Sequence, residues 1–324
     1  MNYCTLFNSH YLSRGLALYQ SLLNHTEKFH LYIFAFDDIA YDILTRMQLA
    51  YVTVISLKEF ETPALLAVKP HRTVAEYCWT STSSTVLHCL EKYHLKEICY
   101  LDADLFFWGD PLTLISEAKD SSMMITEHRY SKEYDHALIS GKYCVQFMYF
   151  KNDINAMQAL HWWRAACLEW CFNRVEEGKF GDQKYLDEWP QRFEGVKVLA
   201  HLGGGVAPWN VQQYDINADN QNSILLKERR TGICFPLIFY HFHGLKFINQ
   251  TIDCGGYKLR SAIYHSLYVP YIQTLLRQEK NSLSKSVNIH GVAIKQNTWL
   301  DWLKDIKKKW RGAYNVVPLT EIKN

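Results

Sequence analysis

Hydrophobic and polar positions at the start of the chain predict a strand–helix–strand–helix–strand order. Apolar runs over residues 2–7, 30–36 and 52–57 have the length and composition of strands. Apolar residues recur every three or four positions over 12–23, which indicates a helix, and aspartates precede a second helix over 37–49. Strands and helices that alternate in this way are typical of the doubly wound, mostly parallel sheets that bind nucleotides.

The most informative stretch is a short apolar run that leads directly into two carboxylates. Residues 98–101 have the pattern of a strand buried on both faces, and Asp102 and Asp104 follow it at once. Charges at such a place are costly unless they are paired or bound to a cation, and ligands of open α/β sheets bind at the carboxyl ends of strands. We therefore favour a divalent-cation site that holds a diphosphate. The alternative is a pair of turn or helix-cap aspartates ahead of residues 109–111.

The remainder of the chain continues the alternation of helices and strands. Helices are predicted over 73–93 and 154–174 and from Gly181 onward. Strands are predicted over 122–126, 143–150, 196–202 and 237–240. Polar residues 213–232 are expected to form a surface excursion, and the residues after Gly255 to be helical with one break near Pro270.

Composition limits the possible functions. The chain has 324 residues, 48% of them hydrophobic and 21% charged, which fits one large α/β domain with an appendage. The net charge of +2 does not indicate a nucleic-acid partner. The opening strands are not followed by Gly-x-Gly-x-x-Gly or Gly-x-x-x-x-Gly-Lys, which disfavours a dinucleotide cofactor and a P-loop.

The cysteines and the apolar segments favour a cytoplasmic protein. The nine cysteines have no zinc-site spacing, so we expect reduced thiols. The N-terminus lacks a basic and apolar leader, and no apolar run reaches the roughly 18 residues that span a bilayer.

Four motifs complete the picture. They are Tyr100-Leu101-Asp102-Ala103-Asp104, Asp182-Gln183, Ala207-Pro208-Trp209-Asn210 and His241-Phe242-His243-Gly244. In this order they resemble motifs of the GT-A nucleotide-sugar glycosyltransferases, and most closely a bacterial branch akin to family eight. The resemblance covers roughly residues 2–250. It implies a GT-A catalytic domain over 1–255, with a nucleotide-sugar half at about 1–110 and an acceptor half at about 111–255, followed by a C-terminal helical region over 256–324.

The resemblance also implies roles for single residues. Asp102, Asp104 and His241 would bind Mn²⁺ or Mg²⁺, and Asp182 and Gln183 would act beside the reacting sugar. The nucleotide-sugar donor would contact Thr5, Leu6, Phe7, Asn8, Tyr77, Asp102, Ala103 and Lys246. The sugar and the acceptor would contact Glu127, Gln146, Trp209 and His243.

Two positions depart from the family pattern. Lys246 stands two residues after Gly244, where the family has its lysine three residues after the glycine. The family's Asn-x-Gly-Val is replaced by residues 144–147, so sugar recognition is expected to differ, with Gln146 in place of the asparagine. For Trp209, which follows a glycine-rich turn, display on a loop and burial in the core are both open.

The resemblance implies transfer of a hexose from a nucleotide diphosphate sugar, expected to be a UDP-sugar, to a glycan or lipid-linked saccharide, with retention of the anomeric configuration. An inverting transferase with Asp182 as general base and an inactive sugar-nucleotide-binding module are the alternatives. A nucleotidyltransferase is disfavoured, because residues 6–16 lack the basic glycine-rich loop of that class.

The last helix has a distinct pattern. Apolar residues, three of them tryptophan, form one stripe over 299–311, and lysines and an arginine surround it. Tryptophan favours the headgroup level of a bilayer and basic residues favour anionic lipid, so we expect this helix to lie on the inner face of the cytoplasmic membrane. The alternative is that the tryptophan face packs on the catalytic domain.

Overall fold

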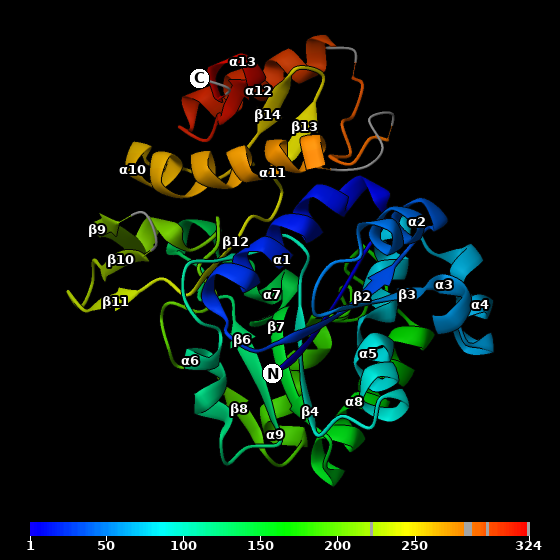
Figure 1. Cartoon of the computed structure of the whole chain (residues 1–324). Coiled ribbons are helices and arrows are strands. Elements are labelled where there is room, and N and C mark those ends of the chain that lie inside the picture. The colour runs from blue at the N-terminus through cyan, green and yellow to red at the C-terminus, as the bar shows by residue number, and fades with distance from the viewer. Residues whose placement is uncertain (221–222, 282–286, 296–297, 323–324) are drawn as a thin grey trace.

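The computed structural model describes residues 1–324 except 221–222, 282–286, 296–297 and 323–324. A seven-stranded sheet with the order β3-β2-β1-β4-β7-β6-β8 forms its centre (Figure 1). The strands are β1 (Asn2–Phe7), β2 (His30–Ala35), β3 (Val52–Ser56), β4 (Glu97–Leu101), β6 (Met123–Glu127), β7 (Tyr143–Lys151) and β8 (Val196–Val198). Only β7 runs against its neighbours in this sheet, which confirms the predicted mostly parallel α/β fold.

Helices cover both faces of the sheet because alternate strand residues point to opposite sides. Tyr3 and Phe7 of β1 pack with α1 (Leu12–His25) and α2 (Asp38–Met47) in one buried cluster. Cys4 and Leu6 of the same strand pack in a second cluster on the opposite face. That cluster includes α5 (Val74–Lys92) and α8 (Ile154–Glu169).

Short elements connect this framework. The α-helices among them are α3 (Leu57–Phe60), α4 (Pro63–Val68), α6 (Leu112–Ile115), α7 (Ala137–Ser140) and α9 (Trp189–Arg192). Single 3₁₀ turns lie at Ser9–Tyr11, Lys69–His71, Ser116–Ala118, Lys132–Tyr134, Lys184–Glu188 and Val211–Gln213. Away from the main sheet, β5 (Leu105–Phe107) pairs with β12 (Phe239–His241).

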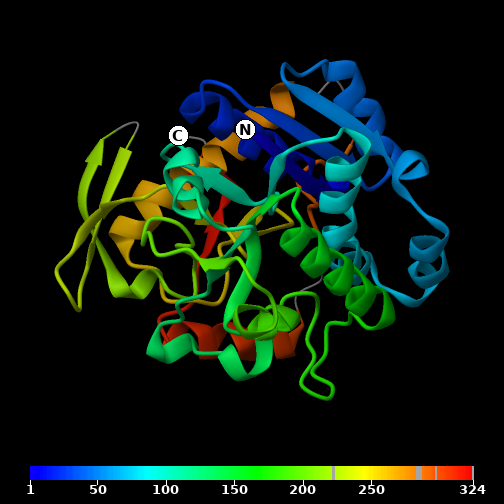
Figure 2. The same cartoon turned by 90° about the horizontal axis from the view of Figure 1, so that it is seen from below.

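Several predicted elements differ in extent or kind. The strand expected over 196–202 ends at Val198. The helix expected over 154–174 ends at Glu169, because the backbone of Trp170 turns extended. The helix expected from Gly181 begins as a 3₁₀ turn at Lys184. The expected polar excursion is instead an antiparallel sheet that projects to one side (Figure 2). Its strands are β9 (Tyr214–Asn220), β10 (Ser223–Glu228) and β11 (Cys234–Pro236).

The C-terminal region is joined to the rest of the chain rather than separate from it. It contains α10 (Ser261–Ile263), a π-helical turn (Tyr264–Tyr268), α11 (Val269–Asn281), α12 (Trp299–Trp310) and α13 (Leu319–Ile322). Its strand β15 (Val316–Pro318) pairs with β14 (Thr251–Asp253), which in turn pairs with β13 (Lys246–Ile248). In addition, the buried guanidinium of Arg14 donates to the carbonyl oxygens of Leu245 (2.9 Å) and His290 (3.0 Å).

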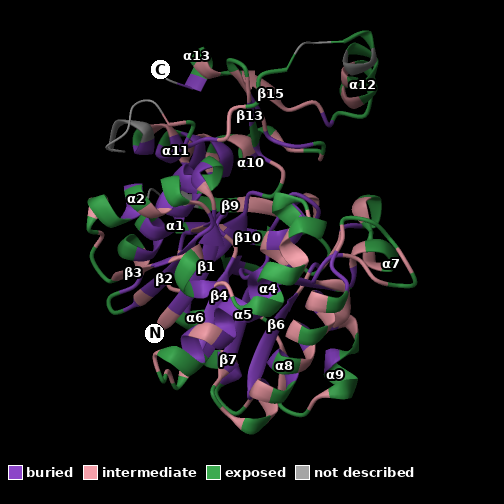
Figure 3. Ribbon diagram, turned by 90° about the vertical axis from the view of Figure 1, so that its right-hand side faces the viewer, coloured by how far each residue is buried: buried purple, intermediate pink, exposed green. Residues whose placement is uncertain are grey.

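The helix α12 lies at the outer edge of the C-terminal region (Figure 3), and its apolar side chains are exposed. Trp299, Trp302 and Trp310 are 70%, 63% and 89% exposed. The half-buried Lys308, on another side of the helix, forms an ion pair with Asp253 of β14 at 3.2 Å. The alternative arrangement, with the tryptophan face packed on the domain, is therefore not observed. No helix in the described part of the chain is long and apolar enough to cross a bilayer.

Glu76 joins the start of α5 to the loop after α8. Its carboxylate accepts hydrogen bonds from the backbone amides of Thr73 (2.8 Å) and Asn173 (2.8 Å), while the Thr73 hydroxyl caps the Glu76 amide. Burial alone would raise the pKa of Glu76, but these hydrogen bonds outweigh it and hold the pKa below its ordinary value.

We predict that Glu76→Ala lowers the free energy of unfolding at pH 7 by about 1–3 kcal/mol, because the capping box and the Asn173 contact are both lost. A lowered folded-state pKa stabilises the protein above the unfolded pKa, and this contribution is lost as the pH falls. Urea denaturation at neutral and acid pH should therefore show the difference from wild type shrinking in acid. The control is Glu59→Ala, because Glu59 also lies three residues after a capping serine but is exposed. An equal effect of the two changes would contradict the prediction.

Candidate active site

The two aspartates of the first motif meet a histidine from a distant part of the chain. Strand β5, directly after Asp104, pairs antiparallel with β12 so that Leu105 lies opposite His241. The amide of Phe242 donates to the carbonyl oxygen of Asp104 at 3.0 Å, which fixes the two segments to each other. This pairing brings together residues 137 positions apart along the chain, as the difference between 241 and 104 gives.

The side chains of this cluster are close enough to share one cation. The Nε2 atom of His241 lies 3.1 Å from Oδ1 of Asp104 and 3.8 Å from Oδ2 of Asp102. Each of the three residues offers one ligand atom, and these three atoms all lie within 4.8 Å of one another. Two carboxylates and one imidazole form a donor set that suits Mn²⁺ and also accommodates Mg²⁺. The residues present therefore fit the cofactor expected from the sequence.

Burial and mutual charge set the ionisation of the cluster. Burial alone would raise the pKa of Asp104, but the adjacent His241 lowers it to about 2. Burial dominates at Asp102 and raises its pKa to about 6, even though His241 acts in the opposite direction. Burial would lower the pKa of His241, yet Asp104 and Asp102 raise it well above its ordinary value. The imidazolium thus compensates the carboxylates in this structure, and a divalent cation could take over that compensation.

Asp182 is buried near the same cluster. Its backbone carbonyl accepts a hydrogen bond from the indole of Trp163 at 2.9 Å. Burial and the charge of Asp102 raise the pKa of Asp182 to about 8. The side-chain amide of Gln183 donates to the carbonyl oxygen of Ser140 at 2.8 Å, so it is held against α7.

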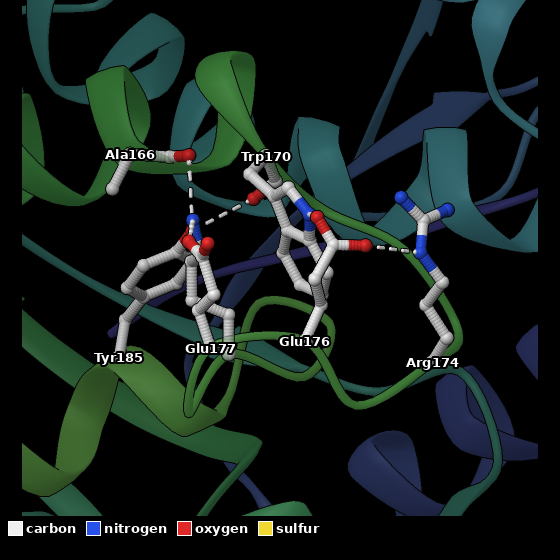
Figure 4. Close-up of polar contacts among 7 residues, drawn as sticks. Ala166, Trp170, Arg174, Glu176, Glu177 and Tyr185 are labelled. Atoms are coloured by element: carbon white, nitrogen blue, oxygen red, sulfur yellow. Dashed lines mark hydrogen bonds and ion pairs between the residues drawn. The ribbon is translucent and has the colours of Figure 1, made fainter.

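The loop that leads to Asp182 is tied back to the end of α8 (Figure 4). The hydroxyl of Tyr185 donates to the carbonyl oxygens of Trp170 (2.9 Å) and Ala166 (3.3 Å). Glu176 accepts hydrogen bonds from Arg174 (2.6 Å) and from the indole of Trp170 (3.1 Å). The Glu176 contacts fix the segment before Asp182, and the Tyr185 contacts fix the segment after it.

The predicted donor-binding residues differ in how deeply they are buried and in where their side chains are directed. Strand β1 buries three of them, Thr5, Leu6 and Phe7. Asn8 is partly buried at the carboxyl end of β1. Because β1 and β4 are parallel, this is the same edge of the sheet as Asp102. Ala103 is buried between the two aspartates, and Lys246 is exposed on β13. Tyr77 is directed elsewhere, since its hydroxyl donates to the carboxylate of Glu61 at 2.8 Å.

The predicted sugar and acceptor residues are also divided. Glu127 is partly buried, 3.9 Å from the ammonium of Lys142, and His243 is exposed. Trp209 is buried, with its indole N–H bonded to the carbonyl oxygen of His128 at 2.9 Å, so the core position rather than the displayed loop position is observed. Gln146 is fully buried and has no exposed surface with which to contact a sugar.

Sequence reasoning missed residues that stand behind or beside the cluster. The hydroxyl of Tyr100 donates to Oδ1 of Asp102 at 3.0 Å, a contact that strand periodicity could have indicated because residues two apart share a face. A cavity of about 840 Å³ was also missed. It is lined by Glu133, Tyr134, His136, Gly256, Tyr257, Lys258, Trp310, Arg311 and Ala313. These residues come from separate segments, and no local pattern connects them.

Solved structures show which fold this is. The galactosyltransferase LgtC, in complex with donor and acceptor sugar analogues, superposes with a TM-score of 0.54 over 88% of this chain and 97% of LgtC, at 9% sequence identity. An active-site mutant of LgtC gives a TM-score of 0.50 with the same coverage and 8% identity. The chain has the GT-A fold of these glycosyltransferases, as its motifs predicted.

Sequence comparison identifies nearer relatives. YfnD of Bacillus subtilis (strain 168), an uncharacterized protein, is 32% identical over 286 residues, which cover 85% of this chain and 89% of YfnD. YfnF of the same organism, also uncharacterized, is 30% identical over 255 residues, which cover 76% of this chain and 82% of YfnF. The protein belongs to the family of YfnD and YfnF. No protein-family model matches the chain.

We predict that Asp104→Asn abolishes Mn²⁺ binding to the purified protein, because an amide of the same shape removes the negative charge opposite His241. Isothermal titration with MnCl₂ measures this directly. Asp110→Asn, beyond β5 and outside the cluster, should bind as wild type does. Retained Mn²⁺ binding by the Asp104 variant would remove Asp104 from the metal site.

Proposed function

We propose that this protein is a metal-dependent glycosyltransferase that moves a hexose from a nucleotide diphosphate sugar, expected to be a UDP-sugar, to a saccharide acceptor. The observation that carries the proposal is the cluster of Asp102, Asp104 and His241 at the carboxyl edge of a GT-A sheet. Its likeness to LgtC, which was solved with donor and acceptor sugar analogues, supports the same substrate classes.

The side chains in and around the cluster would have different roles. Asp102, Asp104 and His241 would hold Mn²⁺ or Mg²⁺, which as a Lewis acid neutralises charge on a departing diphosphate. The end of β1 at Asn8 would receive the nucleoside, and Lys246 would add a positive charge to the diphosphate side. Asp182 and Gln183 would face the sugar, and the exposed His243 would lie beside it.

Two stereochemical outcomes are in competition, and retention is the leading one because of the family resemblance. Inversion is the second candidate, with the buried Asp182 as the general base. The pKa of Asp182 is raised to about 8, and a carboxylate with a pKa near the operating pH is suited to act as a general base on an acceptor hydroxyl.

The test uses the protein with Mn²⁺ and single nucleotide sugars. We expect one donor to be hydrolysed slowly without acceptor and transferred to a saccharide when one is supplied, whereas the Asp104→Asn variant should do neither. The NMR coupling constant of the new anomeric centre then separates retention from inversion. Donor binding without turnover of any donor would favour the inactive sugar-nucleotide-binding module.

We place the saccharide acceptor in the cavity of about 840 Å³. Its aromatic residues Tyr134 and Tyr257 pack against each other, and both contact the buried group around Trp209. The Trp209 ring in turn lies 5.3 Å from the ring of His241. Aromatic faces together with Lys258 and Arg311 supply the mixed apolar and polar surface that a saccharide needs.

The acceptor would be presented at a membrane surface. Trp310 and Arg311, at the end of α12, line the cavity, and the same helix turns its apolar face outward. Such a helix lies in the lipid interface without crossing the bilayer, and its basic residues add attraction to anionic lipid. All nine cysteines are free thiols, which agrees with the cytoplasmic face of the membrane. A lipid-linked saccharide is therefore the acceptor class we favour.

We predict that the full chain floats with anionic vesicles at moderate salt and that Trp302→Glu prevents it, because a carboxylate replaces an indole on the exposed face. Liposome flotation measures the bound fraction. The matched control is Ile294→Glu, since Ile294 is 94% exposed but lies outside α12. Equal loss of flotation in both variants, or no flotation of wild type, would contradict a role for this helix.

A further inference from the structure

Gln146 contacts both halves of the metal-ligand cluster. It lies in the middle of β7 and its side chain is fully buried. Its backbone carbonyl oxygen accepts a hydrogen bond from the amide of Asp102 at 3.0 Å. Its side-chain Oε1 lies 2.8 Å from Nδ1 of His241. One residue therefore holds the backbone of one candidate ligand, Asp102, and the ring of another, His241.

The chemistry of the imidazole determines which way this contact runs. Nε2 of His241 faces Asp104 at 3.1 Å, so a cation in the cluster would bind this nitrogen. For Nε2 to offer its lone pair, the ring proton must be on Nδ1, and the acceptor oxygen of Gln146 keeps it there. When both nitrogens carry protons, Gln146 accepts the hydrogen bond from Nδ1 and Asp104 accepts the one from Nε2. The amide oxygen of Gln146 therefore accepts from Nδ1 in the neutral and in the protonated ring.

Packing keeps the amide in place. Gly205, the last residue of the glycine turn, has a φ of +91°, and a Cβ there would lie 3.3 Å from Nε2 of Gln146 and 2.8 Å from the Thr126 methyl. A glycine at this position leaves the space that the glutamine occupies. On another side of the ring, the Trp209 indole meets His241 edge to face at 5.3 Å.

We propose that Gln146 is a positioning residue of the metal site, which fixes the tautomer and the orientation of His241 so that Nε2 binds the divalent cation. This assignment replaces the sugar contact predicted from the sequence and rests on the metal-dependent function proposed above. A hydrogen-bonded partner on the distal ring nitrogen is the usual companion of a metal-binding histidine, and its loss weakens metal affinity about 10–100-fold.

The experiment measures Mn²⁺ affinity by isothermal titration on the full chain. Gln146→Leu, of similar volume and without an acceptor, should bind Mn²⁺ about 10–100-fold more weakly than wild type. Gln146→Glu should keep the affinity, because its carboxylate accepts the same N–H. Met148→Leu, buried on the same strand, is the control for disturbance of the core. Thermal unfolding in chelator records any loss of stability separately from metal affinity.

A second readout reports the tautomer itself. With ¹⁵N-labelled histidine and diamagnetic Mg²⁺, the wild-type spectrum should show His241 protonated at Nδ1, and Gln146→Leu should lose that single state. If Gln146→Leu does not fold, Gln146→Asn, whose amide is one methylene shorter, should show the same weakening. Wild type that binds no Mn²⁺ would overturn the metal proposal as a whole. Wild-type binding together with unchanged affinity and tautomer in the folded variant would overturn only the role of Gln146.

Discussion

The contact between His241 and Asp104 is the constraint on which the arrangement of the site depends. Both side chains are buried, and a buried charge without compensation is costly. The pairing of β5 with β12 brings the two together, so the second half of the chain must return to the edge where β4 ends. Breaking such a pair by removing one partner typically costs about 3–5 kcal/mol, which makes the position of β12 as important to the fold as to the chemistry.

Much of the framework could be predicted because its signals are local. The first three strands and their helices show periodicities of two and about 3.6 residues, and the structure has them close to the expected bounds. The direction of β7 could not be predicted, since a strand covered on both faces has the same apolar run in either direction. The sheet formed by β9, β10 and β11 was taken for a polar excursion, because a small antiparallel sheet exposes polar residues along its length.

The outward face of α12 shows a second limit of sequence patterns. Amphipathic spacing predicts a helix with one apolar side, but it does not say what covers that side. The position of the helix depends on contacts made by other residues, among them the ion pair of Lys308 with Asp253 and the buried Ala313 just after the helix. Lys308 and Asp253 are 55 residues apart in sequence. Only the folded chain therefore shows which face of the helix is free.

Some residues of the sequence motifs are placed to bind a metal ion, and others are buried behind them and hold them in position. Asp102, Asp104 and His241 present polar atoms to a common point, whereas Gln146 and Asn210 are buried behind them. The amide of Asn210 donates to the carbonyl oxygens of His128 and Gly205, both at 2.8 Å, and so joins β6 to the glycine turn. A metal site needs its ligands held within a fraction of an ångström, and buried hydrogen bonds of this kind supply that rigidity. Residue identity alone cannot separate the two roles, because the same amide and aromatic side chains that bind sugars also satisfy buried backbone groups.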